Sequence, residues 1–254
     1  KTIDVYNLLK CKDNKKCTLE FKIDMYTLKN LGVDYFAPQK IITDVEHPEV
    51  LFIKCLGSLV ILDVDNKQKI HLLEELKTVA TRDLYFRVAV NKYRMVLVSQ
   101  PNIIEEYNLE NIYQPGSVNQ VVKNYPLYGY RIQPDADIEF SDNEFLVYVN
   151  AYDPKMNVSV ILAYQSGFPY SAVLYDTIYL DRLYSKPGFE IEVSGNFVDF
   201  VSIAAGDEFL VYRVFEQPML RMKTTIHDYN FLIKASNPST MLLTDKINVS
   251  IVNF

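Results

Sequence analysis

Residues 50–76 read Val-Leu-Phe-Ile-Lys-Cys-Leu-Gly-Ser-Leu-Val-Ile-Leu-Asp-Val-Asp-Asn-Lys-Gln-Lys-Ile-His-Leu-Leu-Glu-Glu-Leu, and this stretch decides the fold class. Its first two runs, 50–55 and 59–64, are short and rich in β-branched residues, and Gly57-Ser58 separates them as a hairpin turn does. A second turn, Asp65-Asn66-Lys67, leads into a third run at 69–73. The stretch therefore predicts three consecutive antiparallel strands.

Similar groups of short strands follow along the chain. The predicted strands that come third in each group start near residues 2, 59, 103, 158 and 209, a spacing of roughly 44 to 57 residues. Repeats of about 40 to 50 residues are typical of β-propeller blades, in which each four-stranded sheet covers the face of its neighbour. We therefore expect an all-β chain with β-propeller-like blades over residues 1–218. Tandem β-sandwich domains are the alternative, since they also give short strands at regular spacing.

The character of the sequence shifts over residues 219–254. Tyr229-Asn-Phe-Leu-Ile-Lys-Ala-Ser-Asn and Asp245-Lys-Ile-Asn-Val-Ser-Ile-Val-Asn predict two long strands around a loop. This β-sandwich-like hairpin resembles the closing strands of cadherin-like and immunoglobulin-like domains. The resemblance implies part of a large surface protein, and the many Tyr, Asn, Lys and Ile residues are typical of AT-rich coding genomes, such as those of some protists.

Charge and hydropathy exclude several classes of partner. The chain has 254 residues, with 26 basic and 32 acidic side chains and a formal net charge of −6. A general binder of nucleic acid or of anionic membranes needs a basic face instead. No apolar run reaches the ~18 residues that a membrane-spanning helix requires. Because the sequence opens on Lys1 rather than Met, we expect a removed leader or one piece of a longer protein.

Cysteines and glycosylation sequons indicate the compartment. Cys11 and Cys17 end a polar segment whose two ends would be neighbours in a hairpin, so a disulfide between them is sterically reasonable. Cys55 lies in an apolar strand and is expected to be a buried, small hydrophobic residue. Asn157-Val-Ser and Asn248-Val-Ser are acceptors for glycans if the chain is secreted. These features favour an extracellular or cell-surface location, with a cytoplasmic location as the alternative.

Motifs of common enzyme classes are missing from the sequence. Its three histidines, His47, His71 and His227, show no zinc-binding spacing. There is no Gly-x-Ser-x-Gly nucleophile motif, and the eight glycines are scattered rather than grouped into a phosphate-binding loop. Asp63-Val-Asp65-Asn66 starts like a calcium loop but lacks its later ligands. The sequence therefore predicts a non-enzymatic protein without a cofactor or metal.

Two residue groups remain as candidate sites. Alternating acidic residues on one strand could present several carboxylates to a calcium ion, although an exposed, charged strand explains them as well. These residues are Asp135, Asp137, Glu139, Asp142 and Glu144. Aromatic residues could form a stacking platform for sugars or peptides, although packing between blades is the simpler account. They are Tyr125, Tyr128, Tyr130, Phe168, Tyr170 and Tyr175.

These observations lead to a ranked set of functional hypotheses. The first is a non-enzymatic extracellular module for adhesion or assembly, which binds protein partners or itself. The second is an intracellular propeller that acts as a scaffold in a larger complex. The third is a propeller-based glycoside hydrolase with strand-borne carboxylates; Glu74-Glu75 and Glu105-Glu106 do not suit it, because adjacent residues point to opposite sides of a strand.

Overall fold

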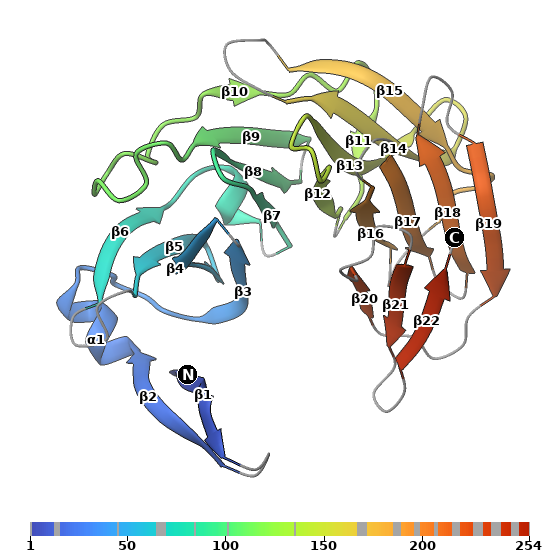
Figure 1. Cartoon of the computed structure of the whole chain (residues 1–254). Coiled ribbons are helices and arrows are strands. Elements are labelled where there is room, and N and C mark those ends of the chain that lie inside the picture. Colours follow the sequence, from blue (N-terminus) through green and yellow to red (C-terminus); the bar gives the residue numbers. More distant parts are fainter. Residues whose placement is uncertain are drawn as a thin grey trace. The chain divides into compact units, whose positions relative to one another are not determined.

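The computed structural model describes most of the chain as a series of antiparallel sheets (Figure 1). For β20–β22 and for most of β1 and β2, the structure describes the backbone alone and not the side chains. The described residues are 2–12, 16–44, 46–64, 70–83, 85–100, 102–134, 136–166, 172–184, 189–195, 199–205, 208–214, 219–225, 231–234, 240–244 and 249–253.

Each sheet is built from strands that follow one another in the sequence. The first two are a hairpin, β1 (Thr2–Lys12) with β2 (Lys16–Asp24), and a four-stranded sheet of β3 (Pro38–Asp44), β4 (His47–Cys55), β5 (Ser58–Asp63) and β6 (His71–Leu76). The next sheet contains β7 (Arg87–Val90), β8 (Arg94–Ser99), β9 (Ile103–Asn108) and β10 (Lys123–Asn124).

The later sheets follow the same order. In the next sheet β11 (Arg131–Ile132) and β12 (Ile138–Phe140) both pair with β13 (Leu146–Asp153), which is followed by β14 (Val158–Gln165) and β15 (Val173–Tyr179). The next sheet contains β16 (Phe189–Ser194), β17 (Asp199–Ala205), β18 (Glu208–Val214) and β19 (Met219–Thr225). This meander of consecutive strands is the connectivity of propeller blades, whereas sandwiches use Greek-key connections between two sheets.

Burial along the second and third strands of these sheets explains the apolar runs in the sequence. In β5 the first five residues are buried, and β14 is buried from Ser159 to Tyr164. A strand that exposes one face would alternate between buried and exposed positions. Continuous burial therefore means that both faces of the strand are covered.

The turn in the opening stretch lies one residue earlier than expected. Cys55 pairs with Ser58, so that Leu56 and Gly57 form a two-residue connection between β4 and β5. Gly57 has a φ of +84°, a left-handed conformation that costs glycine little because it has no Cβ. The glycine therefore sets the register in which β4 and β5 pair.

A short helix replaces the end of a predicted strand. The alternating run at residues 18–26 ends as β2 at Asp24, and α1 (Met25–Asn30) follows. The backbone N–H of Thr27 donates to Asp24 Oδ1 at 2.8 Å, which satisfies one of the free N–H groups of the first turn. The aspartate N-cap thus outweighs the alternating pattern at this point.

The C-terminal segment contains three short strands rather than two long ones. β20 (Phe231–Lys234), β21 (Thr240–Thr244) and β22 (Val249–Asn253) form a sheet of their own. β19, the first strand after the boundary expected at residue 218, is hydrogen-bonded to β18 and completes the preceding sheet. The expectation of two strands was wrong because residues 240–244 form a strand of their own.

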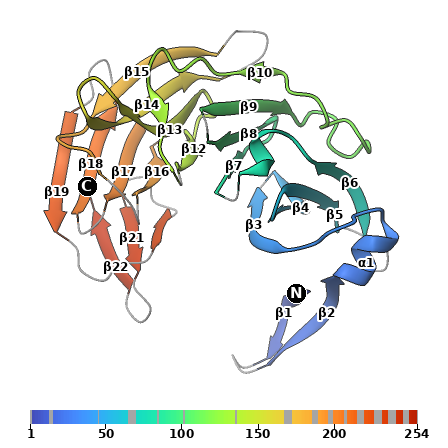
Figure 2. The same ribbon diagram turned by 180° about the vertical axis from the view of Figure 1, so that it is seen from behind.

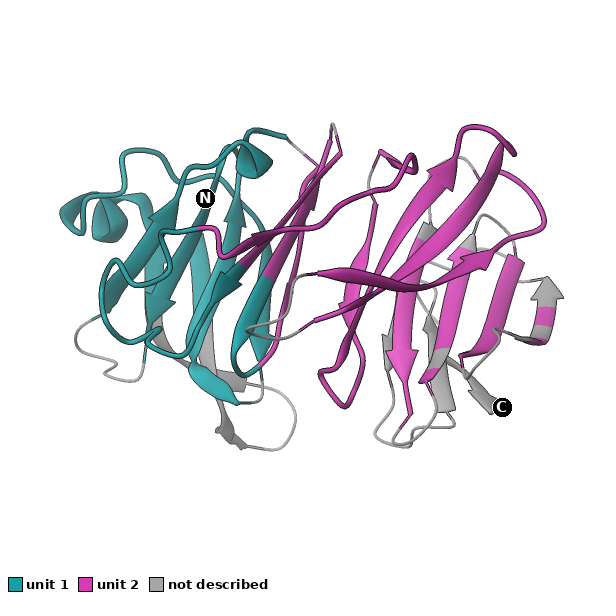
Figure 3. Cartoon of the chain, turned by 90° about the horizontal axis from the view of Figure 1, so that it is seen from above, with its two compact units in different colours: residues 1–84, 92–95, 107–120 teal, residues 85–91, 96–106, 121–254 magenta. Residues whose placement is uncertain are grey.

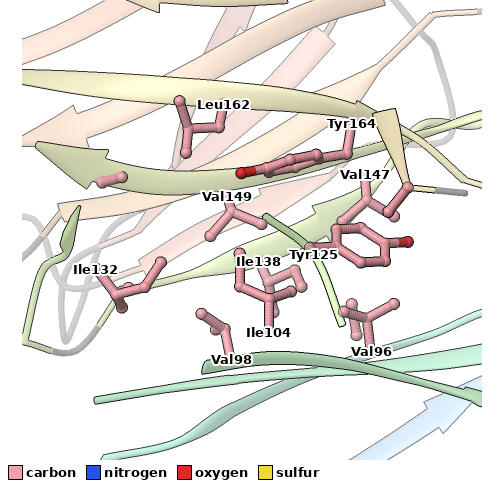
Figure 4. Close-up of a cluster of buried hydrophobic side chains, with 14 of the residues drawn as sticks. Val96, Val98, Ile104, Tyr125, Ile132, Ile138, Val147, Val149, Leu162 and Tyr164 are labelled. Atoms are coloured by element: carbon pink, nitrogen blue, oxygen red, sulfur yellow. The ribbon is translucent and has the colours of Figure 1, made fainter. Parts of the chain in front are cut away.

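Two compact units divide the chain, the first of residues 1–84, 92–95 and 107–120, and the second of residues 85–91, 96–106 and 121–254 (Figure 3). In the first, α1 and the loop after it pack against β4 and β5 through a core that includes Leu28, Phe36 and Ile53. In the second, a core of aliphatic and tyrosine side chains lies between β8, β9 and the strands β12–β14 (Figure 4). Another core joins β13 and β14 to β16–β18.

Candidate functional site

Four tyrosines of the second unit form a group that we call the tyrosine cluster: Tyr128, Tyr130 and Tyr179, which are exposed or partly exposed, and Tyr164, which is buried. Tyr128 and Tyr130 lie in the loop before β11, Tyr164 lies in β14, and Tyr179 ends β15, the outermost strand of its sheet (Figures 1 and 2). The cluster thus combines a loop with two strands of one rigid sheet.

A tight turn holds the loop. The N–H of Tyr130 donates to the carbonyl of Leu127 at 2.8 Å, while Tyr128 and Gly129 have φ values of 48° and 97°. Two consecutive positive φ values are typical of a type I′ turn, which glycine accepts easily and tyrosine only at some cost. The Tyr164 hydroxyl donates to the carbonyl of Pro126 at 2.8 Å and ties the loop to β14. Tyr128 is thereby held 65% exposed.

Hydrogen bonds and nearby charge set the properties of the cluster. The hydroxyls of Tyr130 and Tyr179 lie 2.6 Å apart, so one donates to the other. This bond, together with burial and the negative charge of Asp153, raises the pKa of Tyr179 to about 12. Burial raises the pKa of the Tyr164 hydroxyl as well. Both phenols are therefore neutral hydrogen-bonding groups at physiological pH.

The structure divides the aromatic residues predicted from the sequence. Tyr128 and Tyr130 join the cluster, whereas Tyr125 is buried in the core and Tyr175 is exposed elsewhere on β15. Phe168 and Tyr170 lie outside the described residues. Sequence reasoning missed Tyr164 and Tyr179, because only strand pairing brings them beside the loop. The sequence indicated only that Tyr164 and Tyr179 lie in predicted strands, whose residues alternate between two faces.

The acidic candidates contact backbone groups of a neighbouring sheet. Asp137 Oδ2 accepts from the N–H of Ile191 in β16 at 3.2 Å, and Asp142 Oδ2 accepts from the N–H of Gly195 at 2.8 Å. Asp135 lies outside the described residues. Within the part of the chain that the structure describes, no three His, Cys, Asp or Glu side chains gather in the way that a metal ion needs.

Adjacent Glu105 and Glu106 are both buried, since the residues of β9 from Ile104 to Tyr107 are buried in succession. Glu106 forms a buried cluster with three other side chains. The Tyr125 hydroxyl donates to its Oε2, Ser166 Oγ lies 3.4 Å from the same atom, and Lys123 Nζ lies 3.7 Å from Oε1. This cluster joins β9 to the loop after β14. Its buried carboxylate is paired with the Lys123 ammonium and hydrogen-bonded to the two hydroxyls, as a buried charge requires.

A second buried contact joins β13 to β17. The Tyr148 hydroxyl donates to Asp199 Oδ2 at 2.7 Å, and Tyr148 and Asp199 are only 0% and 6% exposed. Burial and the adjacent carboxylate raise the pKa of Tyr148 well above its ordinary value. The phenol therefore stays protonated and keeps donating to the carboxylate.

An ionic cluster joins the connection after β15 to β18 and β19. Lys223 Nζ lies 2.7 Å from Asp181 Oδ2 and 3.2 Å from Glu208 Oε1. The Tyr184 hydroxyl lies 2.7 Å from Asp181 Oδ1 and 2.6 Å from Glu208 Oε2, and donates its one proton to either carboxylate. The hydrogen bond from Lys223 lowers the pKa of Asp181, and that from Tyr184 lowers the pKa of Glu208. Arg182 adds a contact of 2.8 Å to Glu208. Two positive and two negative charges thus balance within the cluster.

Two of the three histidines, His47 and His71, lie within the described residues. His47 Nε2 lies 2.7 Å from the carbonyl of Lys92, and its ring meets the edge of Tyr113. His71 begins β6, and His227 lies outside the described residues. The spacing argument against a helix-borne zinc site therefore stays a prediction for His227.

The cysteine pair and the two sequons are placed only in part. Cys11 lies in β1 and Cys17 in β2, paired strands of one hairpin, while both side chains lie outside the described residues, as does Asn248. The disulfide stays a prediction. Cys55 is buried, and burial raises the pKa of its thiol to about 12.

Asn157 is exposed in the turn between β13 and β14. Its φ of 55° is a left-handed value that asparagine tolerates better than most residues. The Ser159 hydroxyl, two residues later, is buried and bonds Gln133 and the N–H of Tyr184. Both sequon residues therefore have a role in the fold, and glycosylation stays a prediction.

Comparison with known proteins gives the fold class. No protein-family model and no curated protein matches the sequence. Among the described residues, no helix has the length and apolar character to cross a membrane. A protein of unknown function from Desulfotomaculum acetoxidans is similar in structure over 100% of this chain and 72% of its own, with a TM-score of 0.64 and 12% sequence identity.

Two further solved structures are similar over 86% of this chain. The WD40 domain of SCAP from fission yeast has a TM-score of 0.56 at 11% identity, and Hsv2 from Kluyveromyces lactis has 0.51 at 9% identity. The chain spans 53% and 60% of their lengths. WD40 domains are β-propellers. The fold is thus all-β with propeller-type sheets, as the strand groups of the sequence predicted.

Proposed function

We propose that this chain is a non-enzymatic interaction module, used for adhesion or assembly, whose tyrosine cluster contacts a partner protein. The observation that carries the proposal is the exposure of Tyr128 and Tyr179, 65% and 44%, on a hydrogen-bonded β scaffold. Tyrosine is enriched in protein interfaces because it brings a large apolar ring and a hydroxyl at a low cost in conformational entropy.

A photo-crosslinking experiment tests the contact. A photoreactive phenylalanine analogue placed at position 128 is expected to crosslink a partner in native extracts, whereas the same analogue at Tyr26, which is 76% exposed in the other unit, is not. Equal crosslinking from both positions would indicate non-specific contact. No crosslink at position 128 would argue against the cluster as the interface.

We also propose a location outside the cell or at its surface, on the basis of the two sequons and the Cys11–Cys17 pair. Intact mass of the natively sourced protein is expected to show an excess that glycosidase removes, and alkylation is expected to find Cys11 and Cys17 joined. An Asn157→Gln variant should lose one glycan. An unmodified mass with three free thiols would instead favour an intracellular scaffold.

The glycoside hydrolase alternative gains little support from the described carboxylates. Asp137 and Asp142 accept backbone N–H groups, and Glu106 is buried with Lys123 and Tyr125. A hydrolase needs two carboxyl groups that flank a bound sugar.

A further inference from the structure

We propose that the tyrosine cluster recognises a cationic side chain, an arginine or a lysine in a basic segment of a partner protein. The inference rests on the proposed function and adds to it the chemistry of the partner. An ammonium or guanidinium group over a tyrosine ring is attracted by the negative face of the ring, as quaternary ammonium groups are in aromatic cages.

The hydrogen bonds of the cluster leave ring surface available. Tyr130 and Tyr179 share one hydroxyl–hydroxyl bond, and Tyr164 donates to the Pro126 carbonyl. These polar ends are engaged with each other or with the backbone, and Tyr179 is 44% exposed. Tyr128 adds the most exposed ring of the four, held in place by the turn at residues 127–130.

The nearby charge is negative. Asp153 acts on the Tyr179 hydroxyl through its charge, and its Oδ1 is fixed by the N–H groups of Lys155 and Met156 at 2.7 and 3.2 Å. Tyr130 and Ile132 both pack in the core beside β8 and β9, whereas Arg131 between them is exposed and points away from the face of β11 that carries Ile132. The whole chain carries a net charge of −6. An anionic ligand would be repelled here, whereas a basic segment is attracted.

Strand addition to β15 is a less suitable mode of binding. The pairing of β14 with β15 is irregular between Ala163 and Tyr164, which marks a bulge in the edge strand. The N–H of Thr177 also donates to Asp176 Oδ1 at 2.7 Å. Bulges and charged side chains are devices that protect a sheet edge from pairing with another chain. Recognition through side chains therefore fits this surface better.

Two labelled peptides test the inference by fluorescence anisotropy: one of alternating arginine and glycine, and one with citrulline in place of each arginine. Citrulline keeps the shape of arginine but removes its charge. We expect the arginine peptide to bind the whole chain and the citrulline peptide to bind at least tenfold more weakly. We expect Tyr128→Ser with Tyr179→Ser to weaken arginine binding about tenfold, because two exposed cation–π contacts are lost.

The control variant is Tyr175→Ser, which removes a tyrosine that is 59% exposed on the same strand but outside the cluster. It should bind like the unaltered chain, and thermal melting should show that all variants fold. Equal weakening in both variants, equal binding of the citrulline peptide, or binding of a neutral oligosaccharide instead would each overturn the inference. A specific crosslink from position 128 without arginine binding would overturn it and leave the proposed function standing.

Discussion

Replacing Glu106 with alanine is expected to lower the free energy of unfolding by about 3–5 kcal/mol, because it removes one partner of a buried ion pair. Lys123 would keep a charge whose side chain is only 11% exposed, and the hydroxyls of Tyr125 and Ser166 would lose the carboxylate as an acceptor. Both the desolvated charge and the unmade hydrogen bonds act in the same direction. Chemical denaturation followed by circular dichroism measures the change.

The matched control is Glu110→Ala, which removes an exposed carboxylate four residues later in the sequence. Its effect should stay within about 0.5 kcal/mol, as for most surface substitutions. A double variant, Glu106→Leu with Lys123→Leu, should recover part of the loss, because no buried charge is then left alone. A loss below about 1 kcal/mol for Glu106→Ala would show that the cluster contributes little to stability.

Tyr148→Phe is expected to cost about 2–3 kcal/mol although it removes a single oxygen atom. The lost hydroxyl donates to the buried carboxylate of Asp199, and hydrogen bonds to charged groups are worth about 1.5–3 kcal/mol. The aromatic ring stays in place, so the core between β13 and β17 keeps its packing. Thermal melting and denaturant titration of the variant measure the loss.

Two comparisons make this second prediction specific. Tyr175→Phe removes the same atom from an exposed side chain and should leave stability unchanged within about 0.5 kcal/mol. In an Asp199→Asn background, Tyr148→Phe should cost less stability, because losing a hydrogen bond costs less for a neutral buried acceptor than for a charged one. An equal loss in both Tyr→Phe variants would contradict the role assigned to the Tyr148–Asp199 contact.

Much of the fold was predictable from apolar runs and turns. Residues 50–55 and 59–64 were recognised as strands because β-branched residues and Gly57 mark a hairpin within a few positions of each other. Local hydrogen bonding overrode the pattern at Asp24, which caps α1 instead of continuing a strand. The strand at Thr240–Thr244 was missed because polar turn residues precede it and no alternation distinguishes it from the loop.

The candidate site was predictable only in part. Tyr128 and Tyr130 stand in one short tyrosine-rich segment and were recognised there, but so was Tyr125, which the structure places in the core. The sequence does not state which tyrosines of such a segment face solvent. Asp137 and Asp142 were candidate metal ligands for the same reason, since the backbone N–H donors that bond them, on Ile191 in β16 and on Gly195 just after it, are far away in the sequence.

The sequence by itself determined the all-β class, the grouping of strands and the acidic character of the chain, because strand period, turn residues and net charge are local or additive properties. Only the tertiary structure decided that Tyr164 and Tyr179 complete the tyrosine cluster and that Glu106 and Tyr148 bind partners in other strands. Those contacts depend on the register of β14 with β15 and on how sheets of the second unit pack. The side chains in these contacts are 19 to 60 residues apart in the sequence. The periodicity of a single strand carries no information about pairs separated by that much.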